Sequence, residues 1–295
     1  MILDLIQNSF DGLAMGASYA LLAVGFTLVF GVLRRVNLSY GPAIMFGCYA
    51  ATWVSLTFPS GVFFLLGVTV LGSVLAGAYV EKLCFAPHRK GSAIAAMVAS
   101  FALWMQFEEA VTLVMPKHLY DFPAMFDGEP LAFGPLLLRP EALVMLACAI
   151  AICAALQFLL ARTRFGLAVR AVIDAPVAAQ LAGINLPRVL LLVFLLASAI
   201  GGLAGWLIVS TYTQVTPMLG MWSTLKGLLA MMIGGLGSLR GAIVGGVALG
   251  LVEAHSQWFM GPQARDLVVY LLLFVLLAWR PRWMTTQSAS RPTSA

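Results

Sequence analysis

Long stretches without a charged side chain dominate this sequence. Asp, Glu, Lys and Arg are all absent from residues 12–33, 36–80, 91–107, 142–161 and 189–225. About 20 consecutive apolar residues suffice for a helix to cross the hydrocarbon core of a bilayer. Because 61% of all residues are hydrophobic and 10% are charged, against roughly 25% charged in soluble domains, a soluble fold is excluded. We expect an integral membrane protein whose spans are helical, since lipid cannot satisfy an open backbone.

Turn residues divide the apolar stretches into candidate spans. The segments expected to cross the membrane are 12–33, 37–56, 62–80, 93–115, 142–161, 189–212, 222–236, 242–259 and 267–279. In the second segment, Gly41-Pro42 lies close to its start, which favours a broken or re-entrant piece as much as a straight helix. The predicted fold is an all-α bundle of about eight to ten transmembrane helices. Residues 1–284 form a single membrane domain, and residues 285–295 form a short disordered cytoplasmic tail.

Lysine and arginine distinguish the two sides of the membrane, because cytoplasmic loops carry an excess of them. With the N-terminus outside, 13 fall on the cytoplasmic side: Arg34, Arg35, Lys82, Arg89, Lys90, Arg162, Arg164, Arg170, Arg188, Arg240, Arg280, Arg282 and Arg291. The other 4 are Lys117, Arg139, Lys226 and Arg265. We therefore expect the N-terminus outside and the C-terminus in the cytoplasm. Residues 1–11 carry no basic residue, unlike a signal peptide, so the first span is expected to remain in the mature protein.

Several other classes of protein and site are excluded by residue usage. The basic residues lie in short connections rather than on one face with interleaved aromatics, so nucleic-acid binding is not expected. The four cysteines lie in or beside apolar segments and are expected to be free, buried thiols: Cys48, Cys84, Cys148 and Cys153. The three histidines show no ligand spacing, so no metal site is expected: His88, His118 and His255.

Glycines recur four residues apart within the spans. The pairs are Gly12 with Gly16, Gly201 with Gly205, Gly237 with Gly241, Gly241 with Gly245, and Gly246 with Gly250. Small residues at this spacing let two helix backbones approach closely. We interpret them as helix-packing positions in a compact bundle.

The longest cytoplasmic connection, residues 162–188, has the pattern of a short capped helix. Asp174 is a candidate N-cap, Pro176 suits the first turn, and Gly183 suits the position after the end. A helix of about two turns is not stable alone in water. It must therefore dock, either on the cytoplasmic surface of the chain itself or on a partner.

Three blocks of sequence carry a resemblance to a known family. In the same connection, Arg170-Ala171, Ala178-Ala179 and Gly183-Ile184-Asn185 resemble the coupling loop of ABC importer permeases for branched-chain amino acids. The block from Gly12 through Tyr19 and Gly25 to Gly41 is similar to the first conserved block of the smaller permease in that family. The run from Lys226-Gly227 to Gly245-Gly246 is similar to its second, glycine-rich block.

The resemblance implies a division of labour among subunits. Members pair with a second, related permease, receive substrate from an extracytoplasmic binding protein, and are driven by two cytoplasmic ATPase subunits in the bacterial inner membrane. ATP and Mg²⁺ then belong to the ATPases, and this chain is expected to bind no cofactor and to be no enzyme. In agreement, no Gly-Lys dipeptide of a P-loop occurs. The residues expected to couple to the ATPase are Arg164, Phe165, Gly166, Arg170, Ala171, Asp174, Val177, Ala178, Ala179, Leu181, Gly183 and Ile184.

Polar groups within the spans are candidates for the substrate pathway. A charge at mid-bilayer costs about 2.5 to 3.5 kcal/mol on the insertion scale. We therefore expect the span charges to reach outward or to pair rather than to contact substrate: Glu108, Glu109, Lys226 and Glu253. An amino acid would also need oxygens and amides along its path, which six residues offer: Asn37, Ser39, Tyr40, Gly41, Thr211 and Thr213.

Two alternative functions remain open at this point. A stand-alone secondary transporter or channel for small polar solutes would also be apolar, rich in glycine and positive inside, but it would not need the capped loop helix. An intramembrane enzyme would need a nucleophile with a paired base, and no such set emerges. The substrate itself is not fixed, since the resemblance is compatible with branched-chain or other hydrophobic amino acids, amides and urea.

Overall fold

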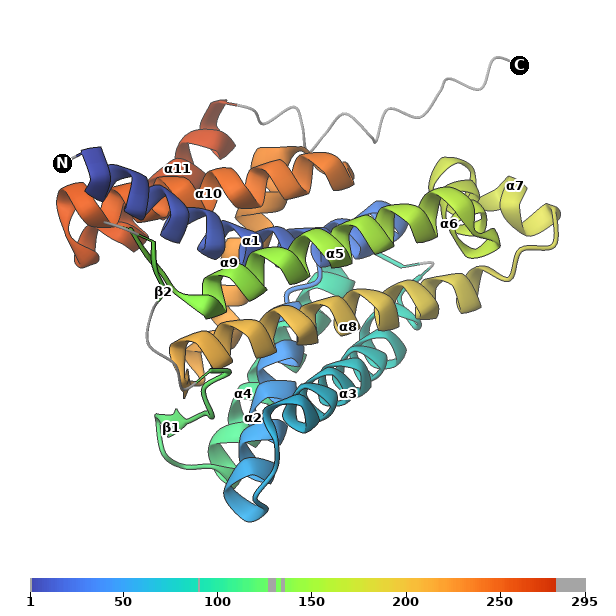
Figure 1. Ribbon diagram of the computed structural model, residues 1–295. Coiled ribbons are helices and arrows are strands. Elements are labelled where there is room, and N and C mark those ends of the chain that lie inside the picture. The colour runs from blue at the N-terminus through green and yellow to red at the C-terminus, as the bar shows by residue number, and fades with distance from the viewer. Residues whose placement is uncertain (1, 90, 127–130, 134–135, 280–295) are drawn as a thin grey trace.

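The computed structural model describes residues 2–89, 91–126, 131–133 and 136–279. Nine long helices account for most of these residues: α1 (Ile2–Leu33), α2 (Tyr40–Thr57), α3 (Val62–Val80), α4 (Ala93–Val114), α5 (Pro140–Arg162), α8 (Leu186–Tyr212), α9 (Met218–Gly234), α10 (Leu239–Met260) and α11 (Pro262–Trp279). Shorter elements are the π-helical turn η1 (Glu81–Phe85) and the helices α6 (Arg164–Asp174) and α7 (Pro176–Leu181). The all-helical fold class is confirmed (Figure 1). The expected tail, 285–295, lies outside the described residues.

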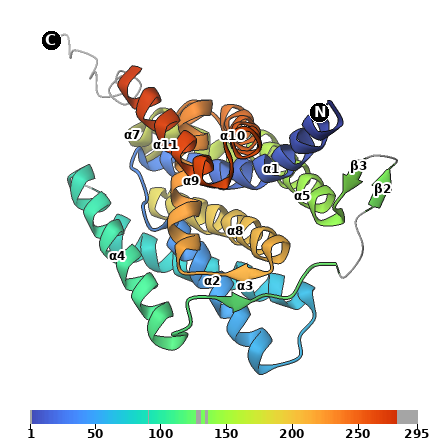
Figure 2. The ribbon, with the colours of Figure 1, turned by 90° about the vertical axis from the view of Figure 1, so that its left-hand side faces the viewer.

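Four very short strands join the loops at one side of the bundle. β1 (Tyr120–Asp121) pairs antiparallel with β4 (Gln214–Val215), and β2 (Leu131–Phe133) pairs antiparallel with β3 (Leu136–Leu138). In the first pair, Tyr120 lies opposite Val215. This pairing ties the connection after α4 to the connection after α8 (Figure 2).

Fewer helices can cross a membrane by length and apolar character than the sequence predicted. Within the described residues there are 5: Leu3–Leu33, Val62–Phe85, Ala93–Val114, Pro140–Arg162 and Leu186–Tyr212. The pair α9 and α10, bent by 118°, would be a sixth if it forms one broken span. The prediction of about eight to ten counted every apolar segment as a span. The difference arises in α2, α9, α10 and α11, which are short or carry glycine and charged residues.

Two helix boundaries differ from the sequence prediction. α1 begins at Ile2, ten residues before the expected start, and Asp4 lies in its first turn, where a negative charge is favourable. The second segment is a continuous helix from Tyr40 to Thr57, because Pro42 lies in its first turn, where no intrahelical N–H is required. The irregular backbone precedes it, with Arg34 at a positive φ of 54°.

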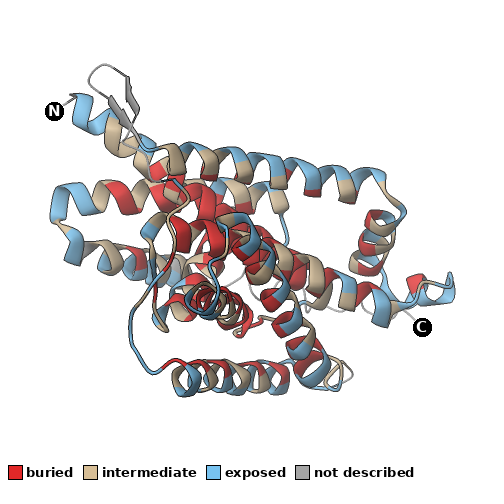
Figure 3. Cartoon of the chain, turned by 60° about the horizontal axis from the view of Figure 1, so that its bottom comes forward, coloured by how far each residue is buried: buried red, intermediate tan, exposed pale blue. Residues whose placement is uncertain are grey.

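The core lies where α1 and α8 run through the bundle. In the most apolar stretch of α1, 83% of the residues are buried, and in that of α8, 67% are buried. The corresponding shares in α3, α4 and α5 are 28%, 22% and 22%. Figure 3 shows the buried residues gathered on the central helices and the outer helices largely exposed. The outer helices thus present apolar faces, as expected of helices that contact lipid or another apolar chain.

The glycines confirm their packing role at the crossing of α1 and α10. A Cβ added to Gly246 would lie 2.3 Å from the backbone nitrogen of Ala20, and one added to Gly250 would lie 2.3 Å from that of Gly16. Such close contact leaves no room for any side chain. The two helices therefore touch backbone to backbone, as small residues allow within a membrane.

This crossing leads to a stability prediction. We expect Gly246→Ala to abolish accumulation of folded protein, because the added methyl group must push α1 and α10 apart. The matched control is Gly67→Ala in α3, where a Cβ meets nothing within 4 Å. There, alanine should stabilise the helix by up to about 1 kcal/mol. Yield of monodisperse protein after detergent extraction checks both. Equal yields for the two variants would contradict this packing.

The four cysteines are free, as expected; Cys48, Cys84 and Cys153 are buried and Cys148 is half-buried. No group of three or more His, Cys, Asp and Glu side chains that could hold a metal ion occurs in the part of the chain that the structure describes.

Candidate functional site

The connection between α5 and α8 forms two helices rather than one. α6 occupies residues that the sequence treated as loop. Its N-cap is Thr163, whose side-chain oxygen accepts a hydrogen bond from the backbone N–H of Gly166 at 3.1 Å. Gly166 lies against the end of α5: an added Cβ would be 2.2 Å from the carbonyl oxygen of Leu160. Val169 and Val172 are buried, so α6 is an amphipathic helix held against the bundle.

α7 follows directly, and its start differs from the prediction. Asp174 is the last residue of α6 and not an N-cap, because α6 continues up to it; the N-cap of α7 is Ala175. Pro176 occupies the first turn as expected. The end also agrees with the prediction, since Gly183 has a φ of +85°. A residue with a positive φ directly after a helix lets the following backbone N–H groups donate to the last carbonyls of that helix. Here Ile184 donates to the carbonyl of Ala179 at 3.0 Å.

α7 presents an apolar face that no part of the described chain covers. Val177 and Leu181, one helical turn apart, are 71% and 86% exposed. Ala179 is 5% exposed and faces the bundle, where α7 contacts α6 and α8. Figure 1 shows α6 and α7 at the right-hand end of α5 and α8, opposite the end where β1 and β2 lie.

The other predicted coupling residues lie on the same two helices, except Gly183 and Ile184, which directly follow α7. Exposed among them are Arg164, Arg170, Asp174, Ala178 and Gly183; half-buried are Phe165, Ala171 and Ile184. Within the described residues, the side chains of Arg164 and Arg170 make no hydrogen bond or ion pair, so their guanidinium groups remain available to a partner. The structure thus brings the predicted set together at one exposed surface.

Four predicted pathway residues lie together, but in the packed interior. The backbone N–H of Ser39 donates to the side chain of Asn37 at 3.0 Å, and the Ser39 hydroxyl donates to the carbonyl of Ser100. The Tyr40 hydroxyl donates to the carbonyl of Ala197 at 3.0 Å. The N–H of Gly41 donates to the Thr224 hydroxyl at 3.2 Å. These polar groups are satisfied by the protein itself. Their role in transport stays a prediction.

The remaining two predicted pathway residues lie at the end of α8. The Thr211 hydroxyl donates to the carbonyl of Leu207 at 2.8 Å. Thr213 adopts a left-handed conformation with a φ of 54° and accepts a backbone hydrogen bond from Phe122 at 2.9 Å. Both are close in sequence to Tyr212 and Gln214, which line the cavity described next.

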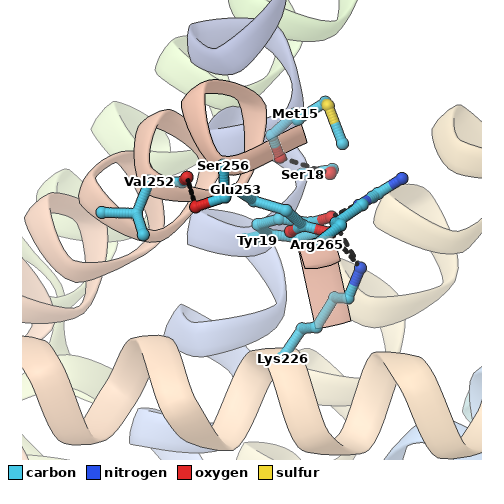
Figure 4. Close-up of polar contacts among 8 residues, drawn as sticks. All are labelled: Met15, Ser18, Tyr19, Lys226, Val252, Glu253, Ser256 and Arg265. Carbon is cyan, nitrogen blue, oxygen red and sulfur yellow. Dashed lines mark hydrogen bonds and ion pairs between the residues drawn. The ribbon is translucent and has the colours of Figure 1, made fainter. Parts of the chain in front are cut away.

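A cluster of charges joins four helices. Glu253 of α10 is fully buried, and Lys226 of α9 donates to its Oε1 atom at 2.6 Å. Arg265 of α11 makes an ion pair with the same oxygen. The hydroxyl of Tyr19, on α1, accepts from Lys226 at 3.0 Å and from Arg265 at 3.1 Å (Figure 4). Lys226 and Glu253 thus pair with each other, which is one of the two outcomes expected for charges within the spans. Glu108 instead accepts from Trp104 at 3.0 Å, and Glu109 is exposed.

The same cluster forms one wall of a cavity of about 270 Å³. Its polar lining includes Ser18, Tyr19, Gln214, Lys226, Arg265 and Asp266. Its apolar lining includes Leu22, Ile208, Leu219 and Trp222. Pockets for drug-sized ligands measure roughly 300–1,000 Å³, so this cavity suits a smaller solute that is polar at one end and apolar at the other.

Only part of this cluster could be predicted from the sequence. Lys226 and Glu253 stood out as charges within apolar segments, but 27 residues separate them and no spacing rule joins them. Arg265 was counted only as a basic residue on the outer side. Tyr19 and Asp266 carried no separate signal. Only the folding of α10 back across α1 brings the four helices together.

Comparison with known proteins decides the family. Residues 8–278 match the family described as "Branched-chain amino acid transport system / permease component". The chain belongs to this family. The permease is thus a multi-pass membrane protein and a transport subunit.

Full-length relatives support the assignment. The permease is 28% identical over 289 residues to the high-affinity branched-chain amino acid transport system permease protein LivH of Escherichia coli K12, covering 94% of each chain. It is 26% identical over 290 residues to BraD of Pseudomonas aeruginosa, again covering 94% of each. Among solved structures, an inward-facing metal-chelate type ABC transporter matches its fold with a TM-score of 0.54 at 16% identity, covering 93% of the permease and 85% of that chain.

Proposed function

We propose that the permease is the membrane subunit of an ATP-driven importer for branched-chain or other hydrophobic amino acids. It would pair with a second, related permease, take substrate from an extracytoplasmic binding protein, and bind two cytoplasmic ATPases. ATP and Mg²⁺ are held by the ATPases. The family and the relatives named for branched-chain amino acid transport support this substrate class.

The observation that carries the proposal is the exposed apolar face of α7. An apolar pair on a short helix at the end of a bundle is expected to enter a groove of a partner, and the anchors then are Val177 and Leu181. Exposed Arg164 and Arg170 supply charged contacts beside it. Because α6 and α7 rest directly on α5 and α8, movement of the partner would pass to the long helices as a rigid-body shift.

The proposed sidedness follows from the basic residues. With α6 and α7 in the cytoplasm and α2 crossing the membrane along with α1, α3, α4 and α5, the N-terminus and the connections after α8 and α10 face outward. Residues 1–284 then act as one permease domain. The apolar outer faces of α3, α4 and α5 are available to lipid and to the second permease.

Reconstitution tests this function. The permease is placed in proteoliposomes together with a second permease, the ATPases and a binding protein from the same organism. We expect labelled leucine to be taken up, and uptake to be competed by isoleucine and valine but not by ribose, which lacks charged ends and an apolar side chain. Uptake competed by ribose and not by isoleucine would overturn the proposed substrate class.

A further inference from the structure

Charged side chains lie around the cavity beside Glu253, and the proposed coupling to an ATPase does not involve them. Two cations and two carboxylates lie in or beside its wall: Lys226, Arg265, Glu253 and Asp266. The charges sum to zero. Glu253 is fully buried and does not line the cavity, and both cations donate to its Oε1 atom, which fixes them in place.

Both cations keep hydrogen-bond donors to spare. Lys226 has three donors and uses two, on Tyr19 and Glu253. Arg265 uses its Nε and Nη2 atoms, and within the described residues its Nη1 atom has no partner. The side chains are 12% and 23% exposed, and both line the cavity. They can therefore donate to a carboxylate that enters it, and such charge-assisted bonds are the strong ones.

Asp266 supplies the opposite charge. It lines the cavity and makes no hydrogen bond or ion pair with any residue the structure describes. The remaining wall is apolar, with Leu22, Ile208 and Leu219 beside Trp222. A neutral sugar offers no charged group to Lys226, Arg265 or Asp266, and a simple anion would be repelled by Asp266. A zwitterion with an apolar side chain satisfies all three parts of the wall.

We propose that this cavity binds an amino-acid zwitterion on the outward side of the permease. Lys226 and Arg265 hold its carboxylate, Asp266 holds its ammonium group, and the apolar wall receives its side chain. This site rests on the proposed function, since it gives that function a binding position within this chain. The cavity lies beside the connection after α8 and the start of α11, which face outward in the proposed topology.

Protection of a thiol from labelling tests the site in the full-length permease, without the binding protein. Gln214 is exposed and lines the cavity, so Gln214→Cys places a reactive thiol there. Thr57→Cys, at the exposed end of α2, is the control position. The unsubstituted protein gives the background of its four native cysteines. The probes are leucine, isocaproate, which lacks the ammonium group, and ribose.

We expect leucine at about ten times its Kd to slow labelling of Gln214→Cys about tenfold and to leave Thr57→Cys unaffected. Ribose should protect neither. When Asp266→Asn is added to the Gln214→Cys protein, the preference for leucine over isocaproate should disappear. When Arg265→Gln is added instead, protection by leucine should weaken, and Arg265→Lys should restore it. Because Asp266 makes no structural bond, Asp266→Asn tests the site even if Arg265→Gln fails to fold.

Leucine uptake by the complete importer is measured in parallel. The site is wrong, and the proposed function stands, if the importer takes up leucine but leucine does not protect Gln214→Cys. The same conclusion follows if leucine protects Gln214→Cys equally after Asp266→Asn is added, with its preference over isocaproate unchanged. If the importer does not take up leucine, the proposed function fails first.

Discussion

Leu181→Asp is expected to stop transport while the permease still inserts and folds. Leu181 is 86% exposed, so the change costs the isolated chain little stability. In the assembled importer the same side chain is proposed to be buried by an ATPase. Burying a leucine contributes about 1.5–3 kcal/mol, and 1.4 kcal/mol corresponds to a factor of about ten in affinity. An aspartate adds the cost of a buried charge, so both ATPase binding and uptake should fall by more than about tenfold.

Co-purification of the ATPases with the permease measures the first effect, and uptake into proteoliposomes measures the second. Gln180→Glu is the matched control, because it adds the same negative charge at the neighbouring exposed position without removing an apolar side chain. It should bind the ATPases and transport like the unsubstituted protein. Wild-type uptake by Leu181→Asp would show that α7 is not the coupling surface.

Glu253→Gln is expected to lower the stability of the permease strongly. Lys226 and Arg265 both depend on this buried carboxylate, so its neutralisation leaves two cations side by side in a buried region. Breaking a buried ion pair by removing one partner costs about 3–5 kcal/mol. For a chain of this size, 1 kcal/mol corresponds to roughly 2–4 °C, so the thermal midpoint of the purified permease should fall by at least about 6 °C.

The control for this variant is Glu109→Gln. Glu109 is exposed and makes no hydrogen bond or ion pair within the described part of the chain, so its loss should leave the midpoint unchanged. A Glu253→Gln variant that melts with the unsubstituted permease would mean that the cluster does not hold α9, α10 and α11 together.

Most of the helical architecture was predictable because lipid restricts what a chain can do. Each expected apolar segment corresponds to one long helix, and the glycine spacing of α1 and α10 marked a real backbone contact. Fewer helices than predicted reach the length and apolar character of a single span, because apolar length alone does not separate a straight crossing helix from a bent pair such as α9 and α10. α6 was missed for another reason: its apolar stripe is short and lies between charged residues.

The candidate site was predictable where local sequence determines it. Pro176 and Gly183 delimit α7 through backbone geometry that two or three residues specify. The Asp174 cap failed because the preceding helix extends through it. The charged cavity depends on residues from four helices, so no local pattern could indicate that Tyr19 and Arg265 meet beside Glu253.

The most direct test of the central claim is the ATP dependence of leucine uptake by the reconstituted importer. Proteoliposomes are prepared with all partner subunits, with the ATPases omitted, or with the permease alone, each with and without ATP on the cytoplasmic side. We expect uptake only when the complete set of subunits and ATP are both present. Uptake of leucine by the permease alone, at the same rate without ATP, would contradict it and identify a stand-alone transporter.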